Sequence, residues 1–374
     1  CVCASLGDLN SSLRVLEIRS CHALKIFDWL EKHHGFKMEK DSWLPSLGKF
    51  VVCNCPHLQV LAPLRPSATF SELLISRVST FLMMDGFSIE AFEIKPNSLL
   101  GEFSGEMRLD DKILAFLNLR DLKHFEIKGC LNLVSISLIS FSHLVSLESL
   151  SIENCTKLFS DILSPHTHED MIAANYNSLP YLESLSIVSC GITGKWLSMV
   201  LRHALTMKEL VIKDCPKLTE LQIEGGGNSQ SNLILASEAS SSGYLNDCSA
   251  SSAQDGLWCV SLNVTSSLKK LTIYNCPHLI FEGGRKGFTG FTSLEFLRIE
   301  ECPVLLLSSL VHGRLLLPQL LEEIEIGDYY QETLQPCFLN NHTCLKHLAV
   351  GYSQSLNSLM LHSCTSLEDL TIRP

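Results

Sequence analysis

The chain has 374 residues, more than one globular core usually organises, so its length predicts either several domains or a repeat architecture. Hydrophobic residues make up 46% of it and charged residues 18%, a composition that excludes a disordered polyelectrolyte. The 29 Lys and Arg against 40 Asp and Glu give a net charge of -11 without any basic cluster, which argues against a nucleic-acid-binding surface. Polar residues interrupt the most apolar stretch, 304–317, so no membrane insertion is expected.

A twelve-residue unit recurs along the chain in the form Leu-x-x-Leu-x-Ile-x-x-Cys-x-x-Leu. One clear copy has Leu147, Leu150, Ile152, Cys155 and Leu158 at the defining positions. In chain order, twelve copies begin at Leu13, Leu47, Phe70, Leu122, Leu147, Leu182, Met207, Leu268, Leu294, Leu321, Leu345 and Leu367, and a degenerate thirteenth copy holds Ile89, Phe92 and Ile94. Neighbouring copies are often 22 to 27 residues apart, which is the period of a leucine-rich repeat.

Each unit has the alternation of a short strand with one buried face. Positions four and six are apolar, whereas positions three, five and seven are mostly polar. The chain must return over about 15 to 20 residues to start the next parallel strand. The predicted fold is therefore α/β, a leucine-rich-repeat solenoid (horseshoe) with a concave parallel sheet of about 12 to 13 short strands and an irregular convex side. Proline after position nine, at Pro56, Pro216, Pro277 and Pro303, is expected to disfavour a helix immediately after the strand.

Cysteine occupies position nine in most copies. Nine of the 16 cysteines lie there or at its equivalent: Cys21, Cys55, Cys130, Cys155, Cys190, Cys215, Cys276, Cys302 and Cys364. A small buried thiol is a weak donor that can serve the carbonyls of the turn. Stacked coils about 4.8 Å apart hold such thiols too widely for a disulfide, and a linear row does not close around a tetrahedral zinc. Unpaired buried thiols suit a reducing compartment, so the sequence predicts a cytoplasmic location.

The period is interrupted most clearly by a Gly- and Ser-rich segment at 225–257, which predicts a flexible insertion within a single repeat domain of residues 1–374. Shorter interruptions lie at 27–43 and 161–177. Because the chain starts at Cys1, without a targeting signal, we expect a fragment of a longer protein. The last copy runs into the chain end without a polar cap, so the isolated piece is expected to aggregate.

Three units carry a family resemblance: LESLSIENCTKL (147–158), LKKLTIYNCPHL (268–279) and LEFLRIEECPVL (294–305). They resemble the leucine-rich repeats of plant intracellular nucleotide-binding leucine-rich-repeat disease resistance proteins, in particular the coiled-coil class of grasses. The resemblance rests on the Cys-Pro form of the unit and covers nearly the whole chain. The family's phosphate loop is absent, because GGRKG at 283–287 lacks both the spacing and the final Ser or Thr.

The resemblance implies the recognition and autoinhibitory domain of a plant immune receptor. Its partners would be a pathogen effector or a host protein that the effector modifies, together with the receptor's own nucleotide-binding domain. No cofactor is expected in this segment, and neither nucleic acid nor membrane is an expected partner. One alternative is the substrate-receptor repeat domain of a ubiquitin ligase.

Positions three, five and seven would lie on the concave face, where a partner can bind without disturbing the core. The predicted partner-binding residues are Lys213, Lys270, Thr272, Tyr274, Phe296, Arg298, Glu300, Glu323 and Glu325. Tyr274 and Phe296 are aromatic residues on neighbouring strands, a residue type that dominates interface energetics. An acidic block beside them comprises Glu300, Glu301, Glu322, Glu323, Glu325 and Asp328, and it could steer a basic partner. The alternative interpretation is a solvated face with ordinary cross-strand neighbours.

Catalytic chemistry has little support in the sequence, so we expect no enzyme, no catalytic residue and no metal site. His166, His168, Glu169 and Asp170 resemble a metal-binding cluster, but no matching Cys or His unit accompanies them. Other candidates are the group Cys337, His342 and Cys344 and the C-x-C pairs Cys1 with Cys3 and Cys53 with Cys55, none with the spacing of a structural zinc site. A metal-dependent hydrolase site around His166 is the second alternative function.

Overall fold

The structure is a computed structural model. It describes residues 3–5, 12–24, 26–28, 46–58, 60–61, 69–78, 107–109, 119–136, 141, 143–158, 179–223, 256–282, 284–311, 314–327, 338–340, 342–351 and 360–373. These residues form two compact units, the first from residues 1–191 and 203–207 and the second from residues 192–202 and 208–374. The interpretation of residues 1–374 as a single repeat domain stays a prediction.

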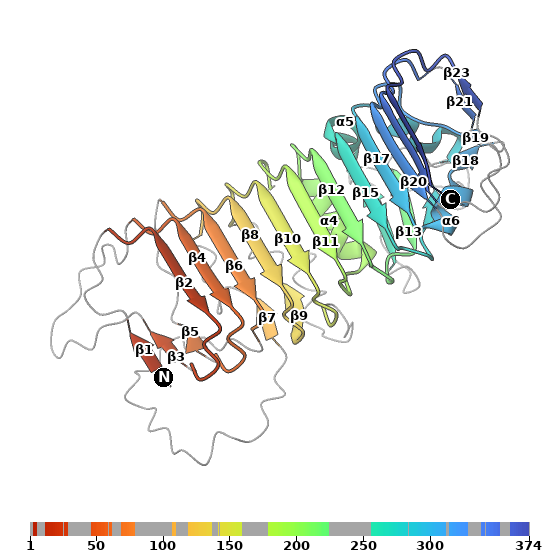
Figure 1. Ribbon diagram of the computed structural model, residues 1–374. Coiled ribbons are helices and arrows are strands. Elements are labelled where there is room, and N and C mark those ends of the chain that lie inside the picture. The colour runs from red at the N-terminus through yellow and green to blue at the C-terminus, as the bar shows by residue number, and fades with distance from the viewer. Residues whose placement is uncertain are drawn as a thin grey trace, which may run out of the picture. The chain divides into compact units, whose positions relative to one another are not determined.

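In both units, positions three to seven of each repeat form a short parallel strand (Figure 1). The first unit contains β2 (Val15–Arg19), β4 (Lys49–Cys53), β6 (Glu72–Ser76), β8 (His124–Lys128), β10 (Ser149–Glu153) and β11 (Ser184–Val188), paired in this order. The second contains β12 (Glu209–Lys213), β15 (Lys270–Tyr274), β17 (Phe296–Glu300), β20 (Glu323–Gly327), β22 (His347–Gly351) and β24 (Asp369–Ile372).

Each residue pairs with the residue at the same repeat position of the next strand; Leu210 pairs with Leu271, for example. One strand per repeat in this constant register is the arrangement of a leucine-rich-repeat solenoid, and it confirms the predicted fold class. All twelve predicted copies supply a strand, and the degenerate copy at residues 89–94 lies outside the described residues.

The core is a stack of aliphatic layers, one layer for each repeat position that faces inward. Leu210 and Ile212 of β12 have no exposed surface, and the equivalent residues of β15, Leu271 and Ile273, have none either. Burying one such side chain contributes about 1.5–3 kcal/mol. The period-two alternation therefore fixes both the strand and the face that it buries.

Position eight ends nine of the main strands in a left-handed conformation, and for β20, β22 and β24 it lies outside the described residues. Backbone φ lies between 49° and 63° at Ser20, Asn54, Arg77, Gly129, Asn154, Ser189, Asp214, Asn275 and Glu301. The N–H of this residue still donates to the next strand, as in Asn275 N to Glu300 O at 3.0 Å. The chain then turns away from the sheet. Gly, Asn, Asp and Ser suit this conformation, whereas Arg77 and Glu301 are unusual there.

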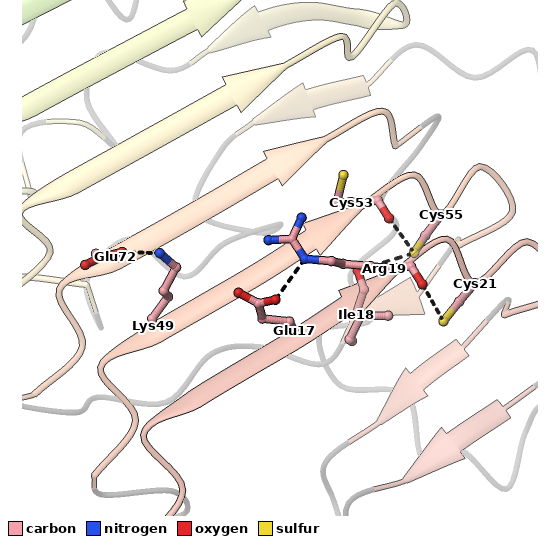
Figure 2. A network of polar contacts seen from close by, with 8 residues as sticks. All are labelled: Glu17, Ile18, Arg19, Cys21, Lys49, Cys53, Cys55 and Glu72. Carbon is pink, nitrogen blue, oxygen red and sulfur yellow. Dashed lines mark hydrogen bonds and ion pairs between the residues drawn. The ribbon is translucent and has the colours of Figure 1, made fainter.

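The thiols at position nine serve the turn, as predicted. Cys55 Sγ lies 3.4 Å from the carbonyl of Cys53 and 3.7 Å from that of Ile18 on the preceding coil (Figure 2). Cys190 makes the same two contacts, to Val188 O at 3.1 Å and Ile152 O at 3.4 Å. The cysteines that the structure describes by their side chains are free thiols.

The side opposite the main strands is more regular than predicted, particularly in the second unit. Its helices are α4 (Gly194–His203), α5 (Leu262–Ser267) and α6 (Pro303–Ser308), with the 3-10 segment η3 (Gly284–Gly290). A small parallel sheet has the order β14 (Leu257–Val260), β13 (Glu220–Ile223), β16 (Ile280–Glu282). The remaining short strands pair as β18 (Leu310–Val311) with β19 (Arg314–Leu315) and β21 (Phe338–Asn340) with β23 (Met360–His362).

In the first unit, the short strands are β1 (Cys3–Ser5), β3 (Ile26–Asp28) and β5 (Val60–Leu61), which form one sheet, and β7 (Met107–Leu109) with β9 (Leu133–Ile136). None of the described helices is long and apolar enough to cross a membrane.

Two expectations about this side need comment. The expectation that proline disfavours a helix after the strand was wrong at Pro303, which is the first residue of α6. Proline is tolerated there because the first N–H of a helix has no intrahelical partner to lose. Of the predicted insertion at 225–257, residues 225–255 lie outside the described residues, and Leu257 already belongs to β14, which pairs with β13. The interruption at 161–177 also lies outside them, as does 29–43 of the first one.

Candidate protein-binding surface

The nine predicted partner-binding residues form a contiguous grid on four neighbouring strands of the second unit. The register places Lys270, Phe296 and Glu323 in one row, Thr272, Arg298 and Glu325 in the next, and Lys213, Tyr274 and Glu300 in a third. Lys270 is exposed, and most of the others are half-buried. The prediction that these positions share one face of the sheet is therefore confirmed by the register. That they bind a partner stays a prediction.

Thr272 differs from its neighbours, because only 9% of its surface is exposed. Its short side chain lies between Val211 on β12 and Arg298 on β17, at the same level of the sheet. The side chains on both neighbouring strands leave it little surface for a partner. The prediction of Thr272 as a contact residue is thus not supported by its burial.

Arg298 ties two strands of the grid together. Its Nη2 lies 2.7 Å from Glu300 Oε2 on the same strand, and its Nε lies 3.1 Å from Glu325 Oε2 on the next. Burial lowers the pKa of Arg298, but the hydrogen bond to Glu300 and the charges of Glu300 and Glu325 outweigh that effect and raise it. Arg298 therefore remains charged and holds both carboxylates in place.

Tyr274 is also fixed by a carboxylate. Its hydroxyl donates to Glu301 Oε1 at 2.7 Å. This hydrogen bond, with burial and the charges of Glu301, Asp214 and Glu300, raises the pKa of Tyr274 to about 12. Asp214 in turn accepts a hydrogen bond from Asn275 Nδ2 at 2.5 Å. The ring thus lies among three carboxylates whose positions are set by neighbouring side chains.

Three of these residues, Asp214, Asn275 and Glu301, occupy position eight and are not among the predicted contact residues. The signal that could have identified them is their position directly after the outward-facing position seven. There the left-handed conformation turns the chain at the edge of the sheet. A glutamate at such a position, as at Glu301, is uncommon and marks the site for attention.

The acidic block predicted beside the aromatic residues is partly neutralised. Glu300 and Glu325 share Arg298, Glu322 lies 2.8 Å from Lys346 Nζ, and Glu301 accepts the hydroxyl of Tyr274. Asp328 lies outside the described residues. The exposed ion pair of Glu322 with Lys346 contributes little to stability, about 0 to 1 kcal/mol. The block is therefore a set of oriented carboxylates rather than an uncompensated charge.

The first unit has ion pairs at equivalent positions, but its described outward-facing strand positions carry no Tyr, Phe or Trp beside them. Glu17 Oε2 lies 2.8 Å from Arg19 Nε, and Lys49 Nζ lies 2.7 Å from Glu72 Oε2 (Figure 2). Among the described outward-facing strand positions, Tyr274 and Phe296 are the Tyr, Phe or Trp residues. The interpretation as an ordinary solvated face thus fits the first unit better than the second.

Most of the predicted metal-binding and catalytic candidates lie outside the described residues. His166, His168, Glu169 and Asp170 lie outside the described residues, as do Cys1 and Cys337. Cys53 and Cys55 point away from each other, Cys53 to the face that carries Arg19 and Cys55 into the turn (Figure 2). His342 is buried in a turn. Within the described residues, no group of three or more His, Cys, Asp or Glu side chains could hold a metal ion.

Comparison with known proteins adds little to this geometry. No protein-family model matches the chain, and no curated protein is significantly similar in sequence. Among solved structures, an internalin (inlF) from Listeria monocytogenes is 11% identical, with a TM-score of 0.27, and the match covers 88% of this chain and 74% of that one. The assignment as a leucine-rich-repeat solenoid rests on the strand register described above.

Proposed function

We propose that the chain is a protein-recognition domain that binds its partner through the outward face of β12, β15, β17 and β20. The observation that carries this proposal is the pair Tyr274 and Phe296, half-buried on adjacent strands beside Arg298. Tyr, Phe and Arg are enriched in protein interfaces, where their large side chains bury a large area. The first unit has no such group on its described strands.

The resemblance of the repeat units to those of plant disease resistance proteins supports the finer proposal. In it, the chain is the recognition and autoinhibitory part of a cytoplasmic immune receptor. It acts without a cofactor or catalysis of its own, and its partner is a pathogen effector or a host protein that the effector modifies. The family's own nucleotide-binding domain would be the second partner in the full-length receptor.

A photo-crosslinking amino acid at position 296 tests the proposed surface. The matched control carries it at position 49, the same repeat position in the first unit. A library of secreted pathogen proteins is presented to both. We expect a discrete crosslinked protein at position 296, whose affinity falls at least about tenfold in the Tyr274→Ala and Phe296→Ala variants. Equal crosslinking at both positions, or unchanged affinity, would refute the proposed surface.

A further inference from the structure

The third row of the grid changes abruptly from side chains to bare backbone. Its residues are Lys213, Tyr274, Glu300, Gly327 and Gly351, each paired with the next across the sheet. Arg373 holds position seven of the last copy, beside Gly351, and its N–H donates to the carbonyl of Val350 at 2.8 Å. On the other side of the two glycines, the last side chain of the row is Glu300. We call these two glycines the glycine shelf.

Among the described residues, no close contact requires glycine at either position. A Cβ on Gly327 would lie 3.5 Å from Glu300 Cγ, and one on Gly351 would lie 3.7 Å from the Cα of Gly327, both ordinary contacts. Neither residue has the positive φ that favours glycine. Glycine in a strand is destabilising, and it often marks a place where a ligand or another backbone approaches closely. The shelf is thus an independent sign that something approaches this part of the row.

Glu300 pairs with Gly327, and Glu301 donates its N–H to the carbonyl of Gly327, so both border the shelf. Asp214 follows β12 on the far side of Tyr274, and all three carboxylates are held in position. Glu300 is bound by Arg298 at 2.7 Å, Asp214 by Asn275 at 2.5 Å, and Glu301 by the hydroxyl of Tyr274 at 2.7 Å. Each carboxylate offers about four acceptor sites, so these contacts leave capacity for further donors. The ring of Tyr274 lies among them as an aromatic surface. We call Tyr274, Asp214, Glu300 and Glu301 the Tyr274 patch.

The charges around the Tyr274 patch indicate which kind of partner segment can bind there. The grid and the patch together hold five carboxylates (Asp214, Glu300, Glu301, Glu323, Glu325) and three cations (Lys213, Lys270, Arg298). An acidic segment would be repelled, and an apolar one would strip water from carboxylates without replacing its hydrogen bonds. A guanidinium avoids both penalties. It is positively charged, it stacks on an aromatic ring, and it donates paired hydrogen bonds to carboxylates.

We infer that the Tyr274 patch and the glycine shelf receive an arginine side chain from a basic segment of the partner protein. This inference rests on the proposed function and adds the chemistry of the partner to it. The backbone of the segment lies along the shelf, and its guanidinium lies against the ring of Tyr274 between Glu300 and Glu301.

The test uses the full chain and labelled Gly-Ser peptides that carry three arginines, three lysines or three glutamines. Binding is measured by fluorescence anisotropy at low and at physiological salt. We expect the arginine peptide to bind at both salt concentrations and more tightly than the lysine peptide, and the glutamine peptide not to bind. Equal affinity for arginine and lysine at physiological salt would overturn the inference, because a diffuse negative charge does not distinguish them.

Three variants separate the patch from the net charge of -11. Glu301→Gln, which keeps an acceptor for Tyr274, should weaken binding of the arginine peptide about tenfold. Gly351→Val should weaken it while keeping or raising the melting temperature, since valine favours a strand. The control Glu153→Gln makes the same charge change at position seven of β10 in the first unit and should leave affinity within about twofold. Equal loss in Glu153→Gln and Glu301→Gln would overturn the inference.

The two proposals fail in different ways. If the protein crosslinked at position 296 contacts the surface through a segment without arginine, the proposed function stands and the inference is overturned. If crosslinking gives no discrete protein while the arginine peptide binds with the expected dependence on Glu301, the patch chemistry is supported and the proposed function is not.

Discussion

The hydroxyl of Tyr274 lies 2.7 Å from Oε1 of Glu301, although the two residues are 27 positions apart in the sequence. The repeat makes this contact possible, because position eight of one coil lies beside position seven of the coil before it. The contact holds an aromatic ring on the outward face in one orientation. It also ties the ring to a residue whose backbone has φ of 55°.

The first prediction concerns the ionisation of Tyr274. Its pKa is raised to about 12, first by the hydrogen bond to Glu301. Because the folded-state pKa lies above the unfolded value, the contribution to stability is complete below about pH 10 and is lost as the pH rises towards 12. Glu301→Gln should lower the pKa of Tyr274, as measured by NMR titration of labelled tyrosine. Glu153→Gln, remote in sequence and in the other unit, should not change it.

The second prediction concerns acid sensitivity in the second unit. His342 is 4% exposed, its ring donates a hydrogen bond to the backbone carbonyl of Pro318, and Nδ1 has no partner among the described residues. Burial lowers the pKa of His342. A lowered folded-state pKa means that stability is complete above the unfolded value of about 6.5 and is lost as the pH falls below it. The melting temperature should therefore fall between about pH 7 and pH 5.

A leucine should remove this sensitivity, because the equivalent turn positions hold Leu119, Leu144 and Leu179, each accepting the same backbone hydrogen bond as His342. A buried nitrogen without a hydrogen-bond partner costs about 1–3 kcal/mol of stability, and His342→Leu removes that nitrogen. We expect a higher melting temperature at pH 5 than in the parent chain. His278→Leu, at an exposed turn position, is the matched control and should retain the parent's pH dependence. The same profile for both variants would contradict the assignment to His342.

The third prediction uses two cysteines that are two residues apart. Cys55 is buried, and burial raises the pKa of its thiol, whereas Cys53 is half-buried on the outward face beside Arg19 (Figure 2). The thiolate is the reactive form, so both burial and the raised pKa protect Cys55. Maleimide labelling of the native chain followed by mass spectrometry should modify Cys53 and spare Cys55. In denaturant both should react. Early modification of Cys55 would show that its turn opens readily.

The sequence predicted the strands and core because both follow from a period of two. Aliphatic residues at positions four and six, such as Leu210 and Ile212, all point to the buried face of the sheet once the strands are in register. The same register explains why the nine surface residues could be grouped correctly. Their burial could not be predicted, because whether Thr272 is accessible depends on how the side chains of Val211 and Arg298 on the adjacent strands pack beside it.

Two other features could not be predicted from the sequence, for different reasons. The left-handed position eight is occupied by residues as different as Gly129 and Arg77, so no single residue type signals it. Strand β14 pairs with β13 although a long Gly- and Ser-rich segment separates them, and periodicity carries no information across such a gap. Strand β14 also approaches the start of α4 closely, which only the structure shows.

That approach gives the last prediction. A Cβ on Gly194, the first residue of α4, would overlap the backbone carbonyl oxygen of Leu257, the first residue of β14. A backbone atom cannot move aside as the end of a flexible side chain can, so the strand or the helix must shift. Gly194→Ala should lower the free energy of unfolding by about 1–3 kcal/mol, as measured by urea denaturation.

Gly327→Ala is the matched control, since a Cβ there meets its nearest neighbour at 3.5 Å. It should be neutral or stabilise the chain by about 0.4–1 kcal/mol, because alanine restricts the unfolded state more than glycine does. The two substitutions add the same methyl group to the same unit and differ in what it meets. If Gly194→Ala unfolds at the same urea concentration as Gly327→Ala, then β14 does not lie against the start of α4, and the small sheet behind the second unit would have to be revised.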